Sequence, residues 1–302
     1  MKALDLFCGC GGLSLGFEKA GFEIVVAYDF WNIAVETYNQ NFLHRALNKD
    51  INMLSIKEIS DYGPDIIIGG PPCQDYSSAG KRDESLGRAI LTKVFAEKIC
   101  GYKPKWFVME NVDRIVKSTN LGEVKRSFKK IGYGLTEVVL DASFYGVPQK
   151  RKRYFLIGGM NECTNFLMTD ILSGQSSVPM TVRNYMGKEL DIEHYYRHPR
   201  SYQRRGVFSI DEPSPTIRGV NRPIPPGYKF HKGDTCKDIE KIRVLTFEER
   251  LQIQTFPKDF IFLGNKTEKE QMVGNAVPVK LAQYVAESLI SYINRQGKSS
   301  CI

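Results

Sequence analysis

The sequence lacks several features that would indicate a secreted, membrane-bound or metal-binding protein. Its 302 residues contain no apolar run long enough to span a membrane, no secretion signal, no repeat and no low-complexity tract. The seven cysteines form no C-x-x-C pair, which excludes the common zinc-site spacing, and their odd number does not suit a disulfide framework. We therefore expect reduced thiols, no metal site and a cytoplasmic location.

Acidic residues are in the minority. The chain has 42 Lys and Arg against 34 Asp and Glu, which gives a net charge of +8. This balance suits a polyanionic partner such as a nucleic acid, although many basic proteins bind none. The length allows about two domains and a substantial hydrophobic core.

The pattern of strands and helices divides the chain unequally. In the first half, short apolar runs alternate with helical segments such as 91–101 and 121–132, which predicts an α/β fold with a doubly wound, mostly parallel sheet. The sequence then becomes turn-rich, basic and aromatic, and it ends in an apolar helical pattern. We therefore expect a first domain at 1–172, a smaller loop-rich domain at 173–265, and a segment at 266–302 that returns to the first domain.

One cysteine stands directly after a short β-branched run. Residues 65–68 predict a buried strand, and Pro71 and Pro72 end it with a rigid segment that cannot become a helix at once. Cys73 is thereby placed at a strand tip, where a thiol is exposed and held in position, as a nucleophile must be. For an isolated cysteine, a buried and inert side chain is the more frequent case. Other residues along the chain favour a nucleophile over a buried, inert cysteine at this position.

Two further apolar runs adjoin groups that complement a thiolate. Residues 106–109 predict a strand that ends at Glu110, and Arg151 and Arg153 precede another predicted strand at 154–159. A solvated carboxylate and a basic surface strand are each common alone, but their occurrence together with Cys73 is much less expected by chance. The three groups could converge at one edge of a parallel sheet, where open α/β sheets bind ligands.

A glycine-rich loop follows the first predicted strand, at 3–7. Gly9, Gly11 and Gly12 lie between this strand and an amphipathic helix, and glycines at such a junction let a cofactor approach the backbone. Their spacing differs from the G-x-G-x-x-G pattern, so a dinucleotide is not the first expectation.

Acidic residues stand at the ends of the next two predicted strands. Asp29 follows the apolar run 24–28 and suits a ribose diol. Asp50, followed by Ile51, suits an adenine amino group. Together with the glycine loop, these residues indicate a site for a nucleoside cofactor.

Six motifs in order resemble those of the DNA cytosine-5 methyltransferases, of the bacterial restriction-modification type, over essentially the whole chain. They are the loop at Asp5–Leu13, the nucleophile motif at Gly70–Gln74, the acid motif at Glu110–Val112, the paired arginines at Gln149–Arg153, the element at Pro213–Arg218 and the final motif at Gly274–Pro278. Any one motif is moderately specific, and six in order are very strong.

The resemblance implies a Rossmann-like fold that uses S-adenosyl-L-methionine to methylate carbon 5 of cytosine in a short specific duplex sequence. Cys73 would add to carbon 6 of a flipped-out base, and Glu110 would hold ring nitrogen 3. Arg151 and Arg153 would lie at the cytosine carbonyl and a nearby phosphate. The implied cofactor-binding residues are Phe7, Gly9, Gly11, Gly12, Leu13, Asp29, Phe30, Asp50, Ile51, Pro72, Leu91, Asn275 and Ala276.

DNA contacts are expected in two regions. Residues 74–90 have the composition of a loop that closes over the base, with Ser77, Ser78, Lys81, Arg82 and Arg88 as contacts. The second domain would recognise the target, and its base-reading or phosphate-binding candidates are Arg197, Arg200, Gln203, Arg204, Arg205, Arg218, Asn221 and Arg222.

Some alternatives remain open. Asp29 stands where the family usually has Glu, a shorter reach to the ribose. One branch of the family methylates transfer RNA with the same nucleophile motif, and a non-catalytic, cofactor-responsive DNA-binding protein would be expected to lack Cys73, Glu110 or Arg153, all of which are present. The expected biological role is protection of host DNA from a cognate restriction endonuclease, by a monomer acting on duplex DNA.

Overall fold

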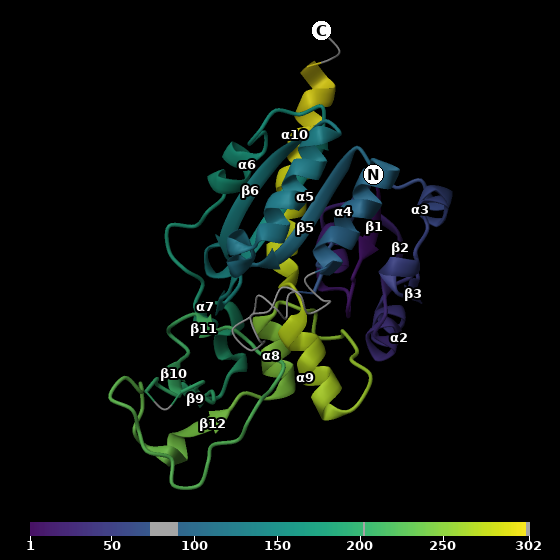
Figure 1. Ribbon diagram of the computed structural model, residues 1–302. Coiled ribbons are helices and arrows are strands. Elements are labelled where there is room, and N and C mark those ends of the chain that lie inside the picture. The colour runs from purple at the N-terminus through teal and green to yellow at the C-terminus, as the bar shows by residue number, and fades with distance from the viewer. Residues whose placement is uncertain (73–89, 202, 300–302) are drawn as a thin grey trace.

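The computed structural model describes residues 1–72, 90–201 and 203–299. A seven-stranded sheet with the order β3-β2-β1-β4-β5-β8-β6 forms its upper part (Figure 1). The strands are β1 (Lys2–Leu6), β2 (Glu23–Asp29), β3 (Ala46–Asn48), β4 (Ile66–Gly69), β5 (Trp106–Val112), β6 (Tyr133–Asp141) and β8 (Lys152–Met160). The accompanying helices are α1 (Gly12–Lys19), α2 (Asn32–Asn41), α3 (Ile56–Tyr62), α4 (Ile90–Tyr102), α5 (Thr119–Lys130), α6 (Met168–Ser173) and α10 (Val279–Ser299).

The sheet is mostly parallel, which confirms the predicted fold class. Strands β3, β2, β1, β4 and β5 pair in parallel, whereas β8 runs antiparallel to both of its neighbours, β5 and β6. The antiparallel direction of β8 was not part of the prediction. It places the start of β8 at the edge where β4 and β5 end.

Helices cover both faces of the sheet, because the central strands are apolar on both sides. In β4, Ile66 and Ile68 face a core that includes Leu281 and Val285 of α10, whereas Ile67 faces the core of α4 and α5. Figure 1 shows α4 and α5 in front of the sheet and α10 behind it. The chain therefore returns from its distant end to support the sheet.

A smaller lower part follows β8. It contains the three-stranded sheet β10-β9-β12 and a two-stranded ladder of β11 and β7, together with α7, α8 and α9 (Figure 1). Their bounds are β7 (Gln149–Lys150), β9 (His194–Tyr196), β10 (Val207–Ser209), β11 (Ser214–Pro215), β12 (Ile242–Val244), α7 (Val182–Met186), α8 (Phe247–Ile253) and α9 (Lys266–Asn275). Helix α8 begins at Phe247, where Thr246 and Glu249 form a capping box. The core of this lower part includes Tyr195 and Phe208, so some of its aromatic residues support the fold.

Within the described ranges, no helix combines the length and the apolar character needed to cross a bilayer. No group of three or more His, Cys, Asp and Glu side chains in the same ranges could hold a metal ion.

Candidate active site and recognition surface

The sheet brings the predicted site residues to one edge. β1, β2, β4 and β5 run in the same direction and therefore end together, and β8 begins beside the end of β5. In the β5–β8 ladder, Val112 lies opposite Arg153 and Glu110 lies opposite Phe155. The antiparallel β8 thus brings Arg153 to the carboxyl ends of the parallel strands, next to Glu110. Open α/β sheets bind their ligands at this edge.

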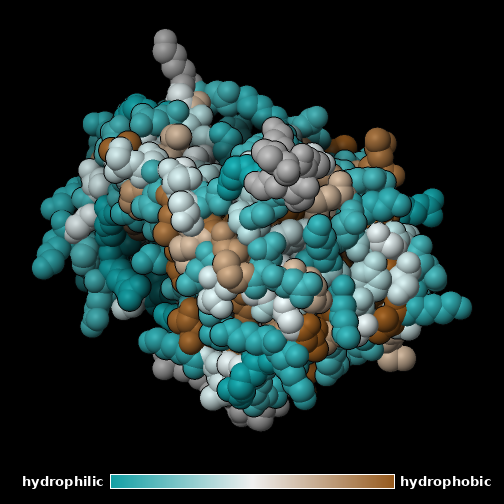
Figure 2. Space-filling model, turned by 90° about the horizontal axis from the view of Figure 1, so that it is seen from above, coloured by the Kyte–Doolittle hydropathy of each residue, from teal (hydrophilic) through white to brown (hydrophobic). Residues whose placement is uncertain are grey.

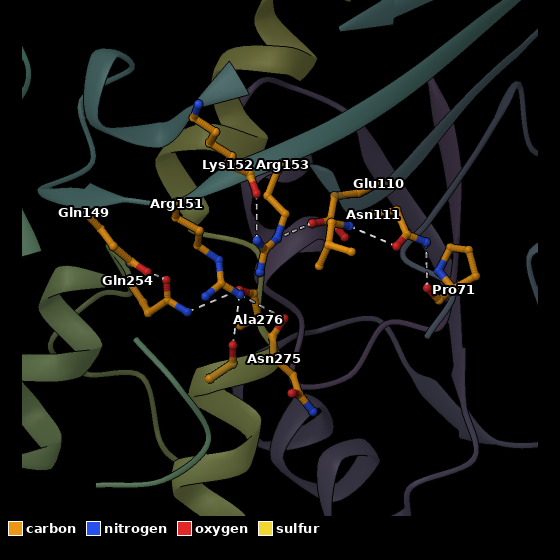
Figure 3. Close-up of polar contacts among 12 residues, drawn as sticks. Pro71, Glu110, Asn111, Gln149, Arg151, Lys152, Arg153, Gln254, Asn275 and Ala276 are labelled. Carbon is orange, nitrogen blue, oxygen red and sulfur yellow. Dashed lines mark hydrogen bonds and ion pairs between the residues drawn. The ribbon is translucent and has the colours of Figure 1, made fainter. Parts of the chain in front are cut away.

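Glu110 and Arg153 form a nearly buried ion pair (Figure 3). Arg153 Nε lies 2.8 Å from Glu110 Oε1, and Arg153 Nη1 donates to the carbonyl oxygen of Lys152 at 2.8 Å. Burial raises the pKa of Glu110, and the positive charges of Arg153 and Arg151 oppose this rise. The carboxyl is therefore held in one orientation with an increased proton affinity, as a general acid requires.

The chain that leads to Cys73 lies against this pair. Asn111 Nδ2 donates to the carbonyl oxygen of Pro71 at 3.1 Å, and a methyl group added to Gly70 would lie 3.1 Å from Glu110 Oε2. The end of β5 thus fixes the segment immediately before the predicted nucleophile. Cys73 itself and five predicted DNA contacts lie outside the described residues: Ser77, Ser78, Lys81, Arg82 and Arg88.

Arg151 is placed differently from the expectation that it contacts the base or a phosphate. Its side chain is buried, with 1% of its surface exposed. Nη1 donates to the carbonyl oxygen of Ile217 at 3.1 Å, and Nη2 donates to those of Gly274 and Ala276 at 2.9 Å each. These bonds direct the guanidinium into the protein, so the geometry favours a positioning role over contact with substrate. The spacing of the two arginines could not reveal this, since the acceptors lie 66 to 125 residues away in sequence.

A hollow of about 350 Å³ opens beside Arg153. Its lining residues are Asp113, Asp141, Lys150, Lys152, Arg153 and Thr216. The lining residues come from the end of β5, from β6, from the start of β8 and from the region of the β7–β11 ladder. The hollow therefore lies between the end of β5 and that ladder. Its lining carries three cations and two carboxyl groups, and of these side chains Arg153 pairs with Glu110.

The glycine loop is shaped by Asp29. Gly9 N donates to Asp29 Oδ2 at 2.8 Å, and Trp31 N donates to Asp29 Oδ1 at 2.9 Å. Burial raises the pKa of Asp29, and these main-chain hydrogen bonds oppose the rise. Phe7, the first residue of the loop, has a φ of 65°, a left-handed conformation that is uncommon for a phenylalanine. Asp29 therefore orders the loop in addition to lying at the end of β2, where a ribose is expected.

The three loop glycines differ in how much free space surrounds them. A methyl group added to Gly9 would meet no atom within 4 Å, whereas one added to Gly11 would lie 2.5 Å from the ring of Phe42. One added to Gly12 would lie 2.4 Å from the carbonyl oxygen of Val277. Open space thus lies above Gly9, while Gly11 and Gly12 face the protein. The cofactor-binding roles implied for Gly11 and Gly12 stay predictions.

An adenosyl group fits the groups at this edge. Phe30, beside Asp29, leaves 66% of its surface exposed and offers a free aromatic face, and Gly9 leaves its approach open. The other residues implied for the cofactor differ in exposure. Leu13 is buried in the first turn of α1, and Asn275 is exposed. Half-buried are Pro72, Leu91 and Ala276. Their roles toward the cofactor stay predictions.

Asp50 is not at the tip of a strand. β3 ends at Asn48, and Asp50 caps a short 3-10 turn (Ile51–Met53), accepting from Asn52 N at 2.9 Å. Asp50 remains exposed and Ile51 is buried beneath it. The carboxyl still lies two residues past the end of β3, so its predicted role toward adenine is unaffected by the correction.

Two residues of the quoted motifs, Asp5 and Asn111, have roles that sequence reasoning did not assign. Asp5 is fully buried in β1 and accepts from Ser14 Oγ at 2.6 Å, below the glycine loop. A charged residue inside an otherwise apolar strand was the available signal. Asn111, which follows Glu110 in the acid motif, holds Pro71 as described above, a contact that the motif does not specify.

The predicted DNA contacts of the second domain fall into two groups. Four are held by the protein itself: Arg197, Arg218 and Asn221 donate to main-chain carbonyls, and Arg205 pairs with Glu212. Four are exposed: Arg200, Gln203, Arg204 and Arg222. Burial lowers the pKa of Arg218, and the nearby charges of Arg200 and Arg222 lower it further. Arg200 and Arg222 therefore lie near Arg218.

Comparison with known proteins identifies the family and the reaction. The sequence model of the family described as C-5 cytosine-specific DNA methylase matches residues 1–291. The chain is 57% identical over 296 residues to the Type II methyltransferase M.HindV of Haemophilus influenzae, with 97% of both chains covered. It is 52% identical over 297 residues to the Type II methyltransferase M.HgiDI of Herpetosiphon aurantiacus, covering 98% of this chain and 96% of the relative.

Solved structures share the fold. A putative DNA modification methyltransferase encoded within an E. coli prophage superposes with a TM-score of 0.72 at 23% identity, covering 97% of this chain and 99% of that one. The Entamoeba histolytica methyltransferase EhMeth gives a TM-score of 0.73 at 20% identity, covering 97% and 98%. The resemblance drawn from the six motifs is confirmed. The chain belongs to the C-5 cytosine-specific DNA methylase family, and it transfers a methyl group from S-adenosyl-L-methionine to carbon 5 of cytosine in DNA.

Proposed function

We propose that the reaction proceeds through a covalent adduct between Cys73 and a flipped-out cytosine in a short specific duplex sequence. One observation carries this proposal: Glu110, paired with Arg153, lies against Gly70, and the adjacent Asn111 holds Pro71 in the segment that leads to Cys73. An acid and a cation are thereby supported at the place where the strand delivers the nucleophile. The base must leave the stack because the target atoms are inaccessible inside a duplex.

The proposed steps follow from the weak nucleophilicity of cytosine carbon 5. The Cys73 thiolate bonds to carbon 6, and electron density moves to carbon 5 while ring nitrogen 3 takes a proton or hydrogen bond from Glu110. Bound S-adenosyl-L-methionine supplies an electrophilic methyl group. A base, which these residues do not identify, then removes the carbon-5 proton, and the electrons expel Cys73. The sulfur–carbon bond breaks and the aromatic ring is restored.

Arg153 has two tasks in this proposal. Its Nε holds Glu110 in place, and its guanidinium would donate to the cytosine carbonyl. A guanidinium in a nearly buried site stabilises developing negative charge more strongly than it would in water. Arg151 has no direct contact with the base in this scheme, because its donors are directed to carbonyl oxygens of the protein.

Target choice is proposed to lie between Thr181 and Lys232. The exposed residues Arg200, Gln203, Arg204 and Arg222 are the candidates for DNA contacts, whereas the four side chains held by the protein shape the surface. An alanine scan read by methylome sequencing separates the two kinds of contact. Loss of a base-reading contact costs about 1–3 kcal/mol and relaxes one position, while loss of a phosphate contact weakens all sites alike. An unaltered methylated motif in all four variants would move recognition to another segment.

We further propose that the protein acts as a monomer and protects host DNA from an endonuclease with the same target. The Type II names of the two relatives support this role, and they favour duplex DNA over transfer RNA as substrate. Purified host DNA from expressing cells should resist cleavage at the methylated sequence. Methyl incorporation into transfer RNA but not into duplex DNA would support the alternative substrate.

The decisive experiment is bisulfite sequencing of DNA from cells that express the wild type or Cys73→Ser. We expect the wild type to methylate one short motif and the serine variant to methylate none, because the hydroxyl is a much weaker nucleophile than a thiolate at neutral pH. Calorimetry with S-adenosylhomocysteine should show that the variant still binds the cofactor product. Sustained methylation by Cys73→Ser would exclude covalent catalysis by this residue.

A further inference from the structure

The main chain of Ile217 is held by two side chains. Its N–H donates to Gln149 Oε1 at 2.9 Å, and its carbonyl oxygen accepts from Arg151 Nη1 at 3.1 Å. Just before this point β11 pairs with β7, with Ser214 opposite Gln149. The Gln149 and Arg151 side chains therefore bond the main-chain N–H and carbonyl of Ile217, just past the end of the two-residue ladder. In a longer strand, main-chain partners would satisfy these two groups.

The same side chains reach the C-terminal part of the chain (Figure 3). Gln149 Nε2 donates to Gln254 Oε1 at 2.8 Å, and Gln254 Nε2 donates to the carbonyl oxygen of Ala276 at 3.2 Å. Arg151 donates to the carbonyl oxygens of Gly274 and Ala276. All three side chains are buried. We name this group the Gln149–Arg151–Gln254 joint. It connects the strand segment before Arg153, the segment at Ile217, the end of α8 and the end of α9.

Two backbone features show how closely the joint fits. A methyl group added to Gly274 would lie 2.1 Å from Gly219 N, so the two main chains touch there. Thr255, directly after Gln254, has a φ of 62°, which is costly for a β-branched residue. Strain of this kind persists where the surrounding structure fixes it, and Thr255 Oγ1 also accepts from Lys280 N at 2.9 Å.

We propose that the Gln149–Arg151–Gln254 joint positions Arg153 for methyl transfer by fixing its strand against the segment that returns from the recognition region. Arg151 and Arg153 are separated by one residue, and Figure 3 shows both guanidinium groups on the same side of the strand. A displacement at Arg151 is therefore passed to Arg153 through Lys152. The joint also fixes residues 217–219, next to the exposed Arg222. Arg151 is thus a positioning residue, and the inference rests on the proposed role of Arg153.

The first test is Arg151→Lys. The variant keeps the charge, but one ammonium group cannot serve both Ile217 and the carbonyls of Gly274 and Ala276 as the planar guanidinium does. We expect the single-turnover rate of methyl transfer to fall by about 100-fold, the loss typical of a misplacement near 1 Å. Affinities for the target duplex and for S-adenosylhomocysteine should change little. Unchanged transfer, or a loss explained by DNA affinity alone, would overturn the proposal.

A matched control separates positioning from general stability. Thr136 is buried in β6, where its Oγ1 accepts from Leu167 N at 3.1 Å, away from the joint. Thr136→Val therefore removes one buried hydrogen bond and should lower the melting temperature while keeping the wild-type transfer rate. A slow Thr136→Val enzyme would mean that any destabilisation slows transfer, and the proposal would fail.

A double-mutant cycle tests whether Arg151 acts through Arg153. If it does, Arg151→Lys combined with Arg153→Lys should be scarcely slower than Arg153→Lys alone, because coupled residues are non-additive. Multiplication of the two single losses would overturn the inference. A wild-type rate in Arg153→Lys would instead contradict the proposed function, so the two failures are distinguishable.

A second variant covers the case in which Arg151→Lys does not fold. Gln254→Met keeps a similar volume and both arginines, but it removes the bonds to Gln149 and Ala276. The transfer rate should fall in the same direction by a smaller factor, with cofactor affinity retained. A folded Gln254→Met enzyme that transfers at the wild-type rate would overturn the proposal.

Discussion

Asp5 is a carboxyl that the fold buries completely. Burial raises its pKa from 3.8 to about 8, and the hydrogen bond from Ser14 opposes the rise. Between these values the native state holds a proton that the unfolded chain has lost. The stabilisation from this group is therefore complete below about pH 4 and is lost as the pH rises toward 8.

Asp5→Asn should remove this dependence, because the amide resembles the neutral acid in shape and carries no titratable proton. We expect the free energy of unfolding to fall less between about pH 5 and pH 8 in the variant than in the wild type. Urea denaturation across this range provides the measurement, with the exposed Asp61→Asn as control. Equal slopes for wild type and Asp5→Asn would show that Asp5 does not hold the proton.

Glu110 should control the alkaline limb of the pH profile. Burial raises its pKa, so it is more often protonated in the native protein than an exposed glutamate is, and it loses the proton to donate as the pH rises. The Cys73 thiolate requires the opposite trend, so the single-turnover rate should follow a bell-shaped curve. In Glu110→Gln the descending limb should disappear, with a rate lower by about 10²–10⁴-fold. A retained descending limb would assign it to another group.

The loop glycines should respond differently to a methyl group. Gly9→Ala places it in open space on the cofactor side, so we expect a folded protein with weaker affinity for S-adenosylhomocysteine, at a strain cost of about 1 kcal/mol. Gly11→Ala places it against Phe42 and Tyr38, which should lower stability by about 1–3 kcal/mol. Calorimetry and thermal melting distinguish the two. Wild-type affinity in Gly9→Ala would remove this space from the cofactor site.

At the scale of elements, α1 and α10 pack so closely that Gly16 permits the contact. A methyl group there would lie 2.4 Å from Ala282 Cβ. Gly16→Ala should therefore reduce stability by about 1–3 kcal/mol despite the better helix propensity of alanine.

Gly122 in α5 provides the matched comparison. An added methyl group would meet only Arg126 Nη1, at 3.7 Å, which is an ordinary contact. Gly122→Ala should therefore gain about 0.5–1 kcal/mol of stability. Urea unfolding of both variants checks the opposite signs, and destabilisation of equal size in both would contradict the account of the α1–α10 contact.

The elements also show where sequence reasoning reached its limit. The apolar runs and terminating residues sufficed for β1, β2, β4 and β5, because buried parallel strands have a strong local pattern. The direction of β8 was not predictable, since β8 inserts between β5 and β6 and the apolar pattern of a strand does not encode its direction. The Arg151 side chain illustrates the same limit, because its acceptors at Ile217 and Gly274–Ala276 are distant in sequence. Asp50 was misplaced by two residues because β3 is short.

At the scale of the whole molecule, the six motifs come from segments spread from Asp5 to Pro278. The fold gathers four of them at one sheet edge: the glycine loop, the start of the nucleophile motif, the acid motif and the paired arginines. The acid motif meets the paired arginines through the β5–β8 ladder, and the last two motifs reach the same region through the Gln149–Arg151–Gln254 joint. The segment at Ile217 and the end of α9 are thereby connected to the strand that carries Arg153. Motif order could indicate the family, but only the structure shows that Arg151 is directed to main-chain carbonyl oxygens while Arg153 pairs with Glu110.

Covalent trapping tests the central claim most directly. Duplex DNA that carries 5-fluorocytosine at the target cytosine should stop the reaction after methyl transfer, because fluorine cannot leave as a proton. Mass spectrometry of the digested complex should then find the methylated base bound to the peptide that contains Cys73, with much less adduct in Glu110→Gln. An enzyme that methylates ordinary duplex DNA yet forms no adduct, or forms it at another cysteine, would contradict the account.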